Sequence, residues 1–533
     1  MDNIKRIVKF DEVLRDELIK GINILTDAVR ITMGPKGKNV LIERPGRHPI
    51  ITKDGVTVAK SINLSAQFQN MGVQIIKEAA SRTADEAGDG TTTATVLAQS
   101  IFTEGVKMIS AGHDPVELRK GLDIGLKSVL ANLSKATKQL SSDEELHQVA
   151  LISANGEEEI SRLISDAVLK VGKEGTVTVE NAKGFNSSLT FVEGIKIDRG
   201  FLSPYFVTNQ DKMHAVLEDC IVLLCEKELN SLKELMKPLE LALESGRSIL
   251  LVANELSSEV MQGLVLNKVK GALKICVIKS PGFGQERTEM MEDLSAITGG
   301  KVFGSSDDFE NFTYEDFGTC KRAIVKRAIT LFVGHGKQDE KIQERVSGLK
   351  ERITDYDIDE KEQEFLQYRI RRLTGGIAVL KVGASTEAEL IERKDRVDDA
   401  LNATKAALDE GILPGGGVAL VRSSFELDLE LTGEESVDAG IKIMKKACQA
   451  PLRQIVTNAG KSPDLILERV KELEGTQGYD ARNSIFGDMM ELGILDPHKV
   501  VRCAIENATS SASMLLSAGA AMIEEKNGSF VSE

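Results

Sequence analysis

The sequence predicts a multidomain protein in which two helical ends belong together and an α/β block lies between them. Three observations lead to this class. The chain has 533 residues, several times the roughly 150 residues of an ordinary domain. Apolar residues recur at helical spacing near both ends, whereas short β-rich runs fill the middle. No segment repeats at a period of about 20 to 50 residues, so a solenoid is not expected.

The N-terminal part reads as long helices joined by glycine-containing loops. From Asp11 to Gly34 the apolar residues recur at helical spacing and stop at the turn sequence GPKG. A second helix is expected over about 69–87. It breaks at the sequence GDG and resumes through TTTATVLAQSIF, so a helix start with glycines before it is expected there.

The middle of the chain predicts strands connected by helices. The runs KEGTVTVE, SILLVA, LKICVIK and GGKVFG alternate with helical segments such as NSLKELMKPLELALESG. One more strand is expected at IAVLKVG, after which ELIERKDRVDDALNATKAALDEG returns to helical spacing. The last hundred residues or so are expected to be mostly helical. The β-rich block therefore reads as an insertion between two ends that form one domain.

Composition argues against several classes of protein. Hydrophobic residues make up 41% and charged residues 28%, close to the averages for soluble globular chains. The sequence contains no run of about eighteen apolar residues, the length needed to span a bilayer. The N-terminus does not resemble a secretory signal. The net charge is −15 and no basic stripe is present, so nucleic acid is not an expected partner. The six cysteines lack metal-like spacing and are expected to be buried thiols in the cytoplasm.

One short motif predicts a phosphate site. Gly88, Asp89 and Gly90 precede three threonines, and glycines let a backbone approach a phosphate closely. The N–H groups at the start of the next helix attract phosphate oxygens, and a carboxylate at Asp89 would suit Mg²⁺. The alternative is an ordinary helix start capped by threonines. The motif is not a Walker P-loop.

Three further loops could share the same ligand. The loop at 32–37 could cover a phosphate, the turn at 52–55 adds charge, and three glycines at 415–417 precede a helix. Each has an ordinary alternative as a loop or hinge. If these loops and Asp496 meet at one ligand, the two ends of the chain must fold as a single domain.

The phrases MGPKGKNV, ITKDGVTVAK, AGDGTTTATVLAQ, RGFLSPYF, SPGFG, RVDDALNATKAA, LPGGGVAL, APLRQIV and GILDP stand in the order and spacing of group I chaperonins. The chain resembles that family, the GroEL type, from about residue 3 to about residue 522. The resemblance implies the chaperonin fold with three domains: a mostly helical equatorial ATPase domain, a small α+β intermediate hinge domain and an α/β apical domain. Their expected ranges are, respectively, 1–135 with 411–533, 136–192 with 378–410, and 193–377.

The resemblance also implies an ATP site that uses Mg²⁺ and K⁺. Asp89 would be the magnesium ligand. Asp399 would position the attacking water, with Asp54 as a second carboxylate; from spacing alone Asp398 competes for this role, since neighbours on a helix face different directions. The residues implied to line the nucleotide pocket are Thr32, Met33, Gly34, Pro35, Lys53, Asp89, Gly90, Thr91, Thr92, Thr93, Gly416, Ile455, Asp480, Ala481, Arg482 and Asp496.

The implied activity is an ATP-dependent chaperone that encloses non-native proteins in a ring, expected to have seven subunits in one or two rings, with or without a co-chaperonin lid. Apolar stripes in the apical domain read as core from composition alone, but the resemblance implies that they are exposed and bind clients. The implied client contacts are Phe201, Tyr205, Phe206, Met236, Leu239, Met261, Val265, Leu266 and Asn267.

Three segments depart from the family pattern. The C-terminal sequence EEKNGSFVSE lacks Gly-Met repeats, which suggests a less filled chamber floor, and 458–464 is less acidic than is usual at ring-to-ring contacts. Arg482 stands where a small residue is usual near the adenine; it could stack on the base or, as we expect, point to solvent. Two other functions remain open, a passive holdase with a weakened ATPase and an unrelated phosphotransferase.

Overall fold

The computed structural model describes residues 6–46, 48–172, 175–182, 184–210, 213–304, 309–335, 339–353 and 360–524. The chain separates into two compact units. Unit 1 takes Met1–Lys173, Val179–Ser188 and Leu380–Glu533, and unit 2 takes Glu174–Thr178 and Leu189–Val379. The finer division into three domains stays a prediction.

Unit 1 is built mainly from helices. Its helices are α1 (Asp11–Arg30), α2 (Gly55–Ser61), α3 (Gln67–Ala87), α4 (Thr91–Ser110), α5 (Pro115–Ala136), α6 (Asp143–Ser153), α7 (Glu158–Val171), α13 (Glu387–Glu410), α14 (Val418–Ser423), α15 (Glu435–Ala447), α16 (Ala450–Asn458), α17 (Pro463–Glu472) and α18 (His498–Leu516). Short antiparallel strand pairs join them: β1 (Arg6–Phe10) with β17 (Ala520–Glu524), β2 (Val40–Ile42) with β3 (Ile50–Thr52), β13 (Ile412–Pro414) with β16 (Leu495–Pro497), and β14 (Gln477–Asp480) with β15 (Ile485–Asp488).

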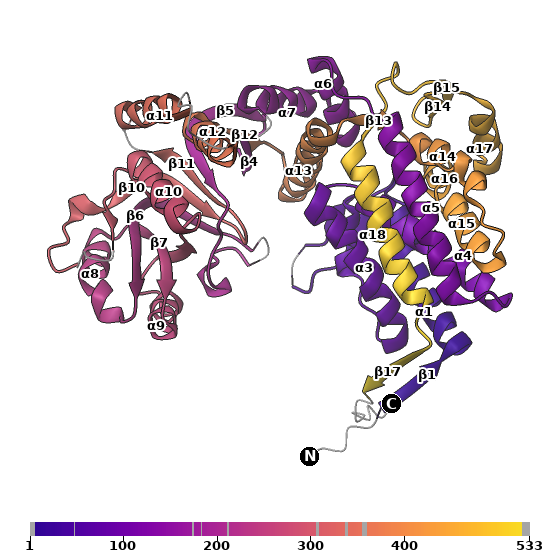
Figure 1. The fold of residues 1–533 in the computed structure, drawn as a ribbon, viewed down its shortest axis with the longest axis horizontal. Helices are drawn as coiled ribbons and strands as arrows, with labels where there is room; N and C mark the ends of the chain where they lie inside the picture. The colour runs from indigo at the N-terminus through magenta and orange to yellow at the C-terminus, as the bar shows by residue number, and fades with distance from the viewer. Residues whose placement is uncertain are drawn as a thin grey trace. The chain divides into compact units, whose positions relative to one another are not determined.

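One apolar core joins the two ends of the chain. It contains buried residues of α1, α4 and α5 from the N-terminal part, such as Leu25, Ile101 and Leu122, and residues of α15 and α18, such as Met444 and Ile505. Helix α18 packs against α3, α4 and α5 (Figure 1). The first and last described strands also pair, with β1 antiparallel to β17. The two ends therefore share a single core.

Helices α5 and α15 cross at a pair of glycines. A Cβ built on Gly121 would lie 2.0 Å from the carbonyl oxygen of Val437, and one on Gly440 would lie 2.3 Å from that of Leu118. No real Cβ atom fits at such distances. The glycines are thus what allows the N-terminal and C-terminal helices to pack at this separation.

Unit 2 is built around a mixed sheet. The strands of this sheet are β4 (Thr176–Asn181), β5 (Ser188–Ile197), β6 (Ala215–Leu229), β7 (Ser248–Leu256), β8 (Ile275–Lys279), β9 (Val302–Phe303), β10 (Gly318–Val325), β11 (Thr330–His335) and β12 (Gly376–Val382), in the order β4-β12-β5-β11-β10-β6-β7-β8 with β9 beside β6. Strands β6, β7 and β8 are parallel, and each has a continuous buried run at its centre, namely 220–225, 249–253 and 275–278. A parallel sheet covered on both faces requires such runs. The accompanying helices are α8 (Met236–Ser245), α9 (Ser258–Val269), α10 (Gly284–Thr298), α11 (Asp339–Ile353) and α12 (Glu360–Thr374).

A buried ion-pair network holds α10, α11 and α12 together. Arg369 of α12 is only 1% exposed, and its guanidinium donates two hydrogen bonds of 2.7 Å to Asp293 of α10. It also pairs with Glu289, and Arg345 of α11 donates to Asp293 at 2.8 Å. A buried charge is tolerated only when it is paired and hydrogen-bonded, so the three helices depend on one another.

Most expected elements are present. The helix expected after Asp11 is α1, the break at GDG separates α3 from α4, and every quoted β-rich run contains a strand. All six cysteines are buried free thiols, as expected. Across the described ranges no helix has the length and apolar character needed to cross a membrane. The segment after Glu524, on which the chamber-floor prediction depends, lies outside the described residues.

Candidate functional site

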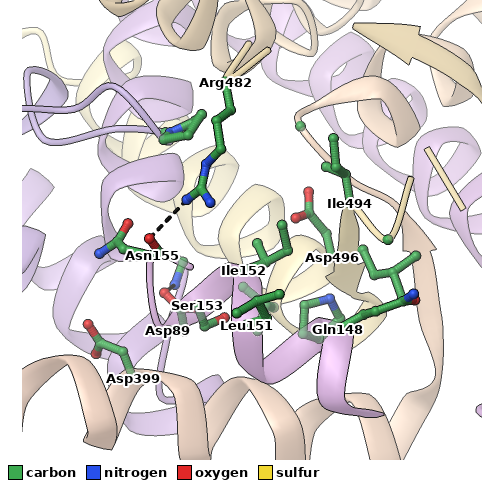
Figure 2. A pocket seen from close by; sticks show the side chains of 18 of the residues that line it. Asp89, Gln148, Leu151, Ile152, Ser153, Asn155, Asp399, Arg482, Ile494 and Asp496 are labelled. Atoms are coloured by element: carbon green, nitrogen blue, oxygen red, sulfur yellow. Dashed lines mark hydrogen bonds between the residues drawn. The ribbon is translucent and has the colours of Figure 1, made fainter. Parts of the chain in front are cut away.

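A single large cavity in unit 1 collects residues from across the sequence. Its volume is about 870 Å³, and it is lined by the loops near Met33, Asp54 and Asp89, by α6 and α13, and by segments near Gly416 and Asp496. Figure 2 shows side chains from several of these elements around one space. A cavity of this size suits a small organic ligand. The sequence expectation that these loops meet at one ligand therefore agrees with the fold.

The start of α4 presents backbone donors to the cavity. Gly88 ends α3 and Gly90 precedes α4, both with positive φ (74° and 84°), and no side chain of the described residues caps α4. The alternative of a helix start capped by threonines is therefore wrong. Thr92 and Thr93 line the cavity, but Thr91 does not. Thr91 is only 8% exposed and lies beside the cavity wall rather than in it.

Helix α13 approaches this loop closely. The amide of Asn402 donates to the carbonyl oxygen of Gly88 at 3.3 Å, and a Cβ on Gly88 would lie 2.4 Å from the Cβ of Asn402. Asp399, one turn earlier on α13, lines the cavity, whereas Asp398 does not. Of the two adjacent carboxylates, the geometry therefore selects Asp399 for the cavity, although its role in catalysis stays a prediction.

The carboxylates around the cavity are half-buried and repel one another. Burial, with the nearby charges of Asp89 and Asp54, raises the pKa of Asp399 well above its ordinary value. Burial likewise raises the pKa of Asp89, although a hydrogen bond of 2.5 Å from the Gly90 N–H opposes this. Such an accumulation of negative charge favours a bound cation.

Asp54 also has a structural task. Its carboxylate precedes α2 and accepts hydrogen bonds of 3.0 Å from the N–H groups of Val56 and Thr57, and one of 2.5 Å from the Thr57 hydroxyl. It is therefore the N-cap of α2. Loss of Asp54 would disturb the local fold as well as the charge of the cavity.

The position of Asp496 disfavours the charged form of its carboxylate. Burial raises its pKa to about 6, and Asp89 adds to this shift, while the N–H groups of Gly416 and Gly417 oppose it. Asp496 follows the start of β16, and β16 pairs with β13, whose end leads into the glycine loop. The sheet thus fixes both Asp496 and Gly416 at the cavity.

We expect Asp496→Asn to stabilise the protein when nucleotide and metal are removed. The native carboxyl binds a proton more tightly than the unfolded one, so the contribution of Asp496 to the free energy of unfolding falls as pH rises from about 4 to 6 and stays low above that. The amide removes this loss. The gain near pH 7.5 should be about 2 kcal/mol, and it should shrink toward pH 4. Urea unfolding in EDTA at several pH values measures it.

Asp438→Asn is the matched control for this experiment. Asp438 is exposed, and hydrogen bonds from Thr432 lower its pKa. Removing this carboxylate should leave the pH dependence of the free energy of unfolding between pH 4 and 6 almost as in the wild type. It cannot raise the free energy of unfolding above pH 7. An equal gain in both variants would contradict the assignment to burial.

The remaining pocket residues are held by short contacts between distant segments. Ile455 of α16 packs against Gly34, where a Cβ would lie 3.1 Å from its side chain. Asn458 donates to the carbonyl oxygens of Arg30 and Met33 at 2.9 Å. The cavity is also lined by the other predicted residues Thr32, Pro35, Lys53, Gly90, Gly416, Asp480 and Ala481.

Arg482 differs from what we expected. Its side chain lies at the cavity and donates a hydrogen bond of 2.9 Å to the carbonyl oxygen of Asn155 (Figure 2). The residue is exposed, but the expectation that it simply points to solvent is wrong. The reason is a partner supplied by the turn after α6, which sequence spacing could not reveal.

One wall of the cavity was missed by sequence reasoning. Helix α6 contributes Gln148, Leu151, Ile152 and Ser153, and the neighbouring β16 segment contributes Ile494. In sequence α6 has three acidic residues in its first turn but no glycine and no phosphate-binding motif. Only its packing against α13 and α7 places it at the site.

A magnesium ion is compatible with this site. No group of three or more His, Cys, Asp or Glu side chains that could hold a metal occurs in the described parts of the chain. Mg²⁺ commonly uses one or two carboxylates and completes its shell with water and phosphate oxygens. The half-buried carboxylate of Asp89, next to the backbone donors at the start of α4, fits that arrangement.

The predicted client residues all lie in unit 2, but not all are exposed. Tyr205 is 69%, Met236 49% and Leu266 52% exposed, whereas Phe206 is 0% and Leu239 8% exposed. The predicted exposure of Phe206 and Leu239 is wrong, because both side chains belong to the core of unit 2.

The other predicted client residues are intermediate. Phe201, Met261 and Val265 are partly buried against the core of unit 2. The amide of Asn267 donates to the Gly263 carbonyl oxygen within α9. Further exposed apolar residues of unit 2 lie outside the predicted set, among them Leu202, Leu243, Val269 and Phe283.

Comparisons with known proteins agree with this geometry. A family model described as the TCP-1/cpn60 chaperonin family matches residues 25–526. Two crystal forms of the chaperonin gp146 from the bacteriophage EL 2 (Pseudomonas aeruginosa), both in the presence of ATP-BeFx, have similar structures. Form II gives a TM-score of 0.68 at 21% identity and covers 98% of this chain and 100% of that chain. Form I gives 0.63 at 21% identity, with 97% and 99% covered.

Proposed function

Because the chain belongs to the TCP-1/cpn60 chaperonin family and has the chaperonin fold, we propose that it is a Mg²⁺-dependent ATPase that binds non-native proteins and encloses them for refolding. The observation that carries this proposal is the cavity of unit 1, where uncapped N–H groups of α4 and half-buried carboxylates surround one ligand-sized space. The related chaperonin gp146 was crystallised in the presence of ATP-BeFx, which supports ATP as the ligand.

Each side chain of the cavity has a task in this proposal. Asp89 would hold Mg²⁺, which when bound neutralises charge on phosphate oxygens. The N–H groups at the start of α4 would bind phosphate, and Asp399 would orient the attacking water. Phosphoryl transfer needs positioning and charge neutralisation rather than a covalent nucleophile. A requirement for K⁺ is part of the same proposal.

The direct test is a steady-state phosphate-release assay with and without a denatured client protein. A chaperonin releases phosphate only with ATP and Mg²⁺, and it suppresses client aggregation in the same mixture. A holdase would suppress aggregation without releasing phosphate. A phosphotransferase would need a small-molecule acceptor, and client protein would leave its rate unchanged.

We propose that clients bind to the exposed apolar side chains of η1 (Pro204–Phe206), α8 and α9, namely Tyr205, Met236, Leu243, Leu266 and Val269. Flexible Leu and Met surfaces accept many partner shapes. Met261, Val265, Phe201 and Asn267 lie beside these residues in the same unit. The contact would therefore be broad and non-specific in sequence.

We expect Leu266→Ser combined with Tyr205→Ser to weaken client capture about tenfold or more, since each lost apolar contact costs about 1 kcal/mol or more. ATP hydrolysis without client should not change. Light scattering of an aggregating client measures the capture. The matched control is Leu429→Ser in unit 1, which is 83% exposed and should capture clients normally. Equal loss in both would contradict the assignment.

The proposal includes a homo-oligomeric ring of seven subunits, single or double, in the cytoplasm, with or without a co-chaperonin. Unit 1 exposes apolar residues at its short strand pairs, including Leu41 at 72%, Phe10 at 61% and Met522 at 57%. The pair β1–β17 also has two free edges among the described strands. These features support contacts with other copies of the chain. Mass measurement with and without ATP tests them.

A further inference from the structure

Arg482 and the turn after α6 form a contact that joins two distant segments at the cavity. We propose that this contact, the Arg482 clamp, consisting of Arg482, Asn155 and Gly156, slows the release of bound nucleotide. The inference rests on the proposed function, since it requires that the cavity binds a nucleotide. It assigns a task to a residue that spacing and composition left unexplained.

The first part of the clamp is the turn that holds the backbone of Arg482. Asp480 is only 4% exposed, and its Oδ1 accepts hydrogen bonds from the N–H groups of Arg482 (2.8 Å) and Asn483 (3.2 Å). Its Oδ2 accepts from the Asn483 amide at 2.7 Å. This turn closes the β14–β15 hairpin and fixes the backbone from which the arginine side chain extends.

The second part is a turn shaped to receive the guanidinium. Asn155 and Gly156 have φ values of 55° and 84°, and their N–H groups donate to Ile152 and Leu151 at 3.0 and 2.7 Å. These bonds close the end of α6. The Asn155 carbonyl oxygen accepts from Nη2 of Arg482 at 2.9 Å.

Gly156 makes room for the arginine. A Cβ at this position would lie 2.2 Å from Nη1 and 2.8 Å from Nη2 of Arg482. Any larger residue would displace the guanidinium, and its positive φ would be strained as well. The turn and the arginine therefore fit each other as a pair.

The clamp acts on the wall of the cavity that sequence reasoning missed. Leu151, Ile152 and Ser153 of α6 line the cavity directly before the clamped turn. Holding the turn to the β14–β15 hairpin restrains α6 against the opposite wall, where Asp480 and Ala481 also line the cavity. A ligand must displace this restraint to leave, so the clamp lengthens its residence.

The test is Arg482→Ala in the full-length assembled protein, with a fluorescent ADP analogue displaced by excess ATP in a stopped-flow instrument. We expect release to become about fivefold faster, because an exposed charge-assisted hydrogen bond contributes roughly 1 kcal/mol. The thermal unfolding midpoint should stay at its wild-type value. A residue with a purely structural role would change the unfolding midpoint instead.

Two controls separate the clamp from other effects of the arginine. Arg469→Ala removes an exposed arginine that pairs with Glu472 and should release the analogue at the wild-type rate. The rate of release from Arg482→Ala, divided by the wild-type rate, should be about the same at low salt and at roughly 0.5 M salt. Long-range attraction between arginine and phosphate would be screened at the higher salt. If Arg482→Ala and the wild type released the analogue at equal rates at this higher salt, the clamp would be overturned.

The remaining outcomes are distinct. Release from Arg482→Ala at the wild-type rate, or more slowly, overturns the clamp while leaving the proposed function intact. Failure of the wild-type protein to bind the analogue with Mg²⁺ overturns the proposed function itself, and the clamp with it.

Discussion

Replacing Asp399 by Ala should leave nucleotide binding intact and lower the rate of ATP hydrolysis by about a hundredfold or more, as expected for loss of a group that positions or activates water. Asp399 lines the cavity from α13, and neighbouring Asp89 and Asp54 raise its pKa together with burial. Its removal relieves that repulsion, so affinity for the nucleotide should not fall. Single-turnover phosphate release and equilibrium binding of a fluorescent nucleotide separate the two effects.

Asp398→Ala is the matched control, because this adjacent carboxylate does not line the cavity. It should hydrolyse ATP at close to the wild-type rate. Asp395→Ala is a second comparison, since Asp395 lines the cavity one turn before Asp399. A greater loss of turnover in either of these variants than in Asp399→Ala would refute the role given to Asp399.

Replacing Arg369 by Ala should destabilise unit 2 by about 3 to 4 kcal/mol, because it leaves buried carboxylates without their main partner. Arg369 is 1% exposed and holds Asp293, which is 5% exposed. The loss of stability should lie in the lower part of the range measured for broken buried ion pairs, because Arg345 still pairs with Asp293. Native-state hydrogen exchange of peptides from β6, β7 and β8 measures the change in the full chain.

Arg322→Ala is the control for this prediction. Arg322 makes an exposed pair with Glu218 at 2.7 Å, and exposed pairs contribute about 1 kcal/mol or less. Its exchange rates should stay near the wild-type values. Similar losses in the two variants would mean that burial of the Arg369 network contributes little to the stability of unit 2.

Much of the fold could be predicted from sequence because its signals are local. The apolar spacing of α1, the glycines around α4 and the β-rich runs of β7 and β8 each depend on neighbours within a few residues. The loops that meet at the cavity could be named for the same reason, since glycines and carboxylates mark them. The selection of Asp399 over Asp398 was not local, because it depends on the approach of α13 to Gly88, across 314 residues of sequence.

The errors came from contacts between distant residues. Thr91 looks like its two neighbours in sequence, but only Thr92 and Thr93 line the cavity. Phe206 and Leu239 lie near exposed apolar residues in sequence, but both belong to the core of unit 2. The side chain of Arg482 donates to an acceptor 327 residues away. Helical spacing and motifs carry no information about such partners.

The pairing of β1 with β17 has a consequence for synthesis on the ribosome. Helix α18 and β17 complete the core that α1, α3 and α4 begin, and a chain emerges from its N-terminus at about 5 to 20 residues per second. The apolar faces of those first helices must therefore stay uncovered until α18 and β17 have been synthesised. At that rate the roughly 400 residues between α4 and the end of α18 take about 20 to 80 seconds, during which the chain exposes apolar surface and is prone to aggregate.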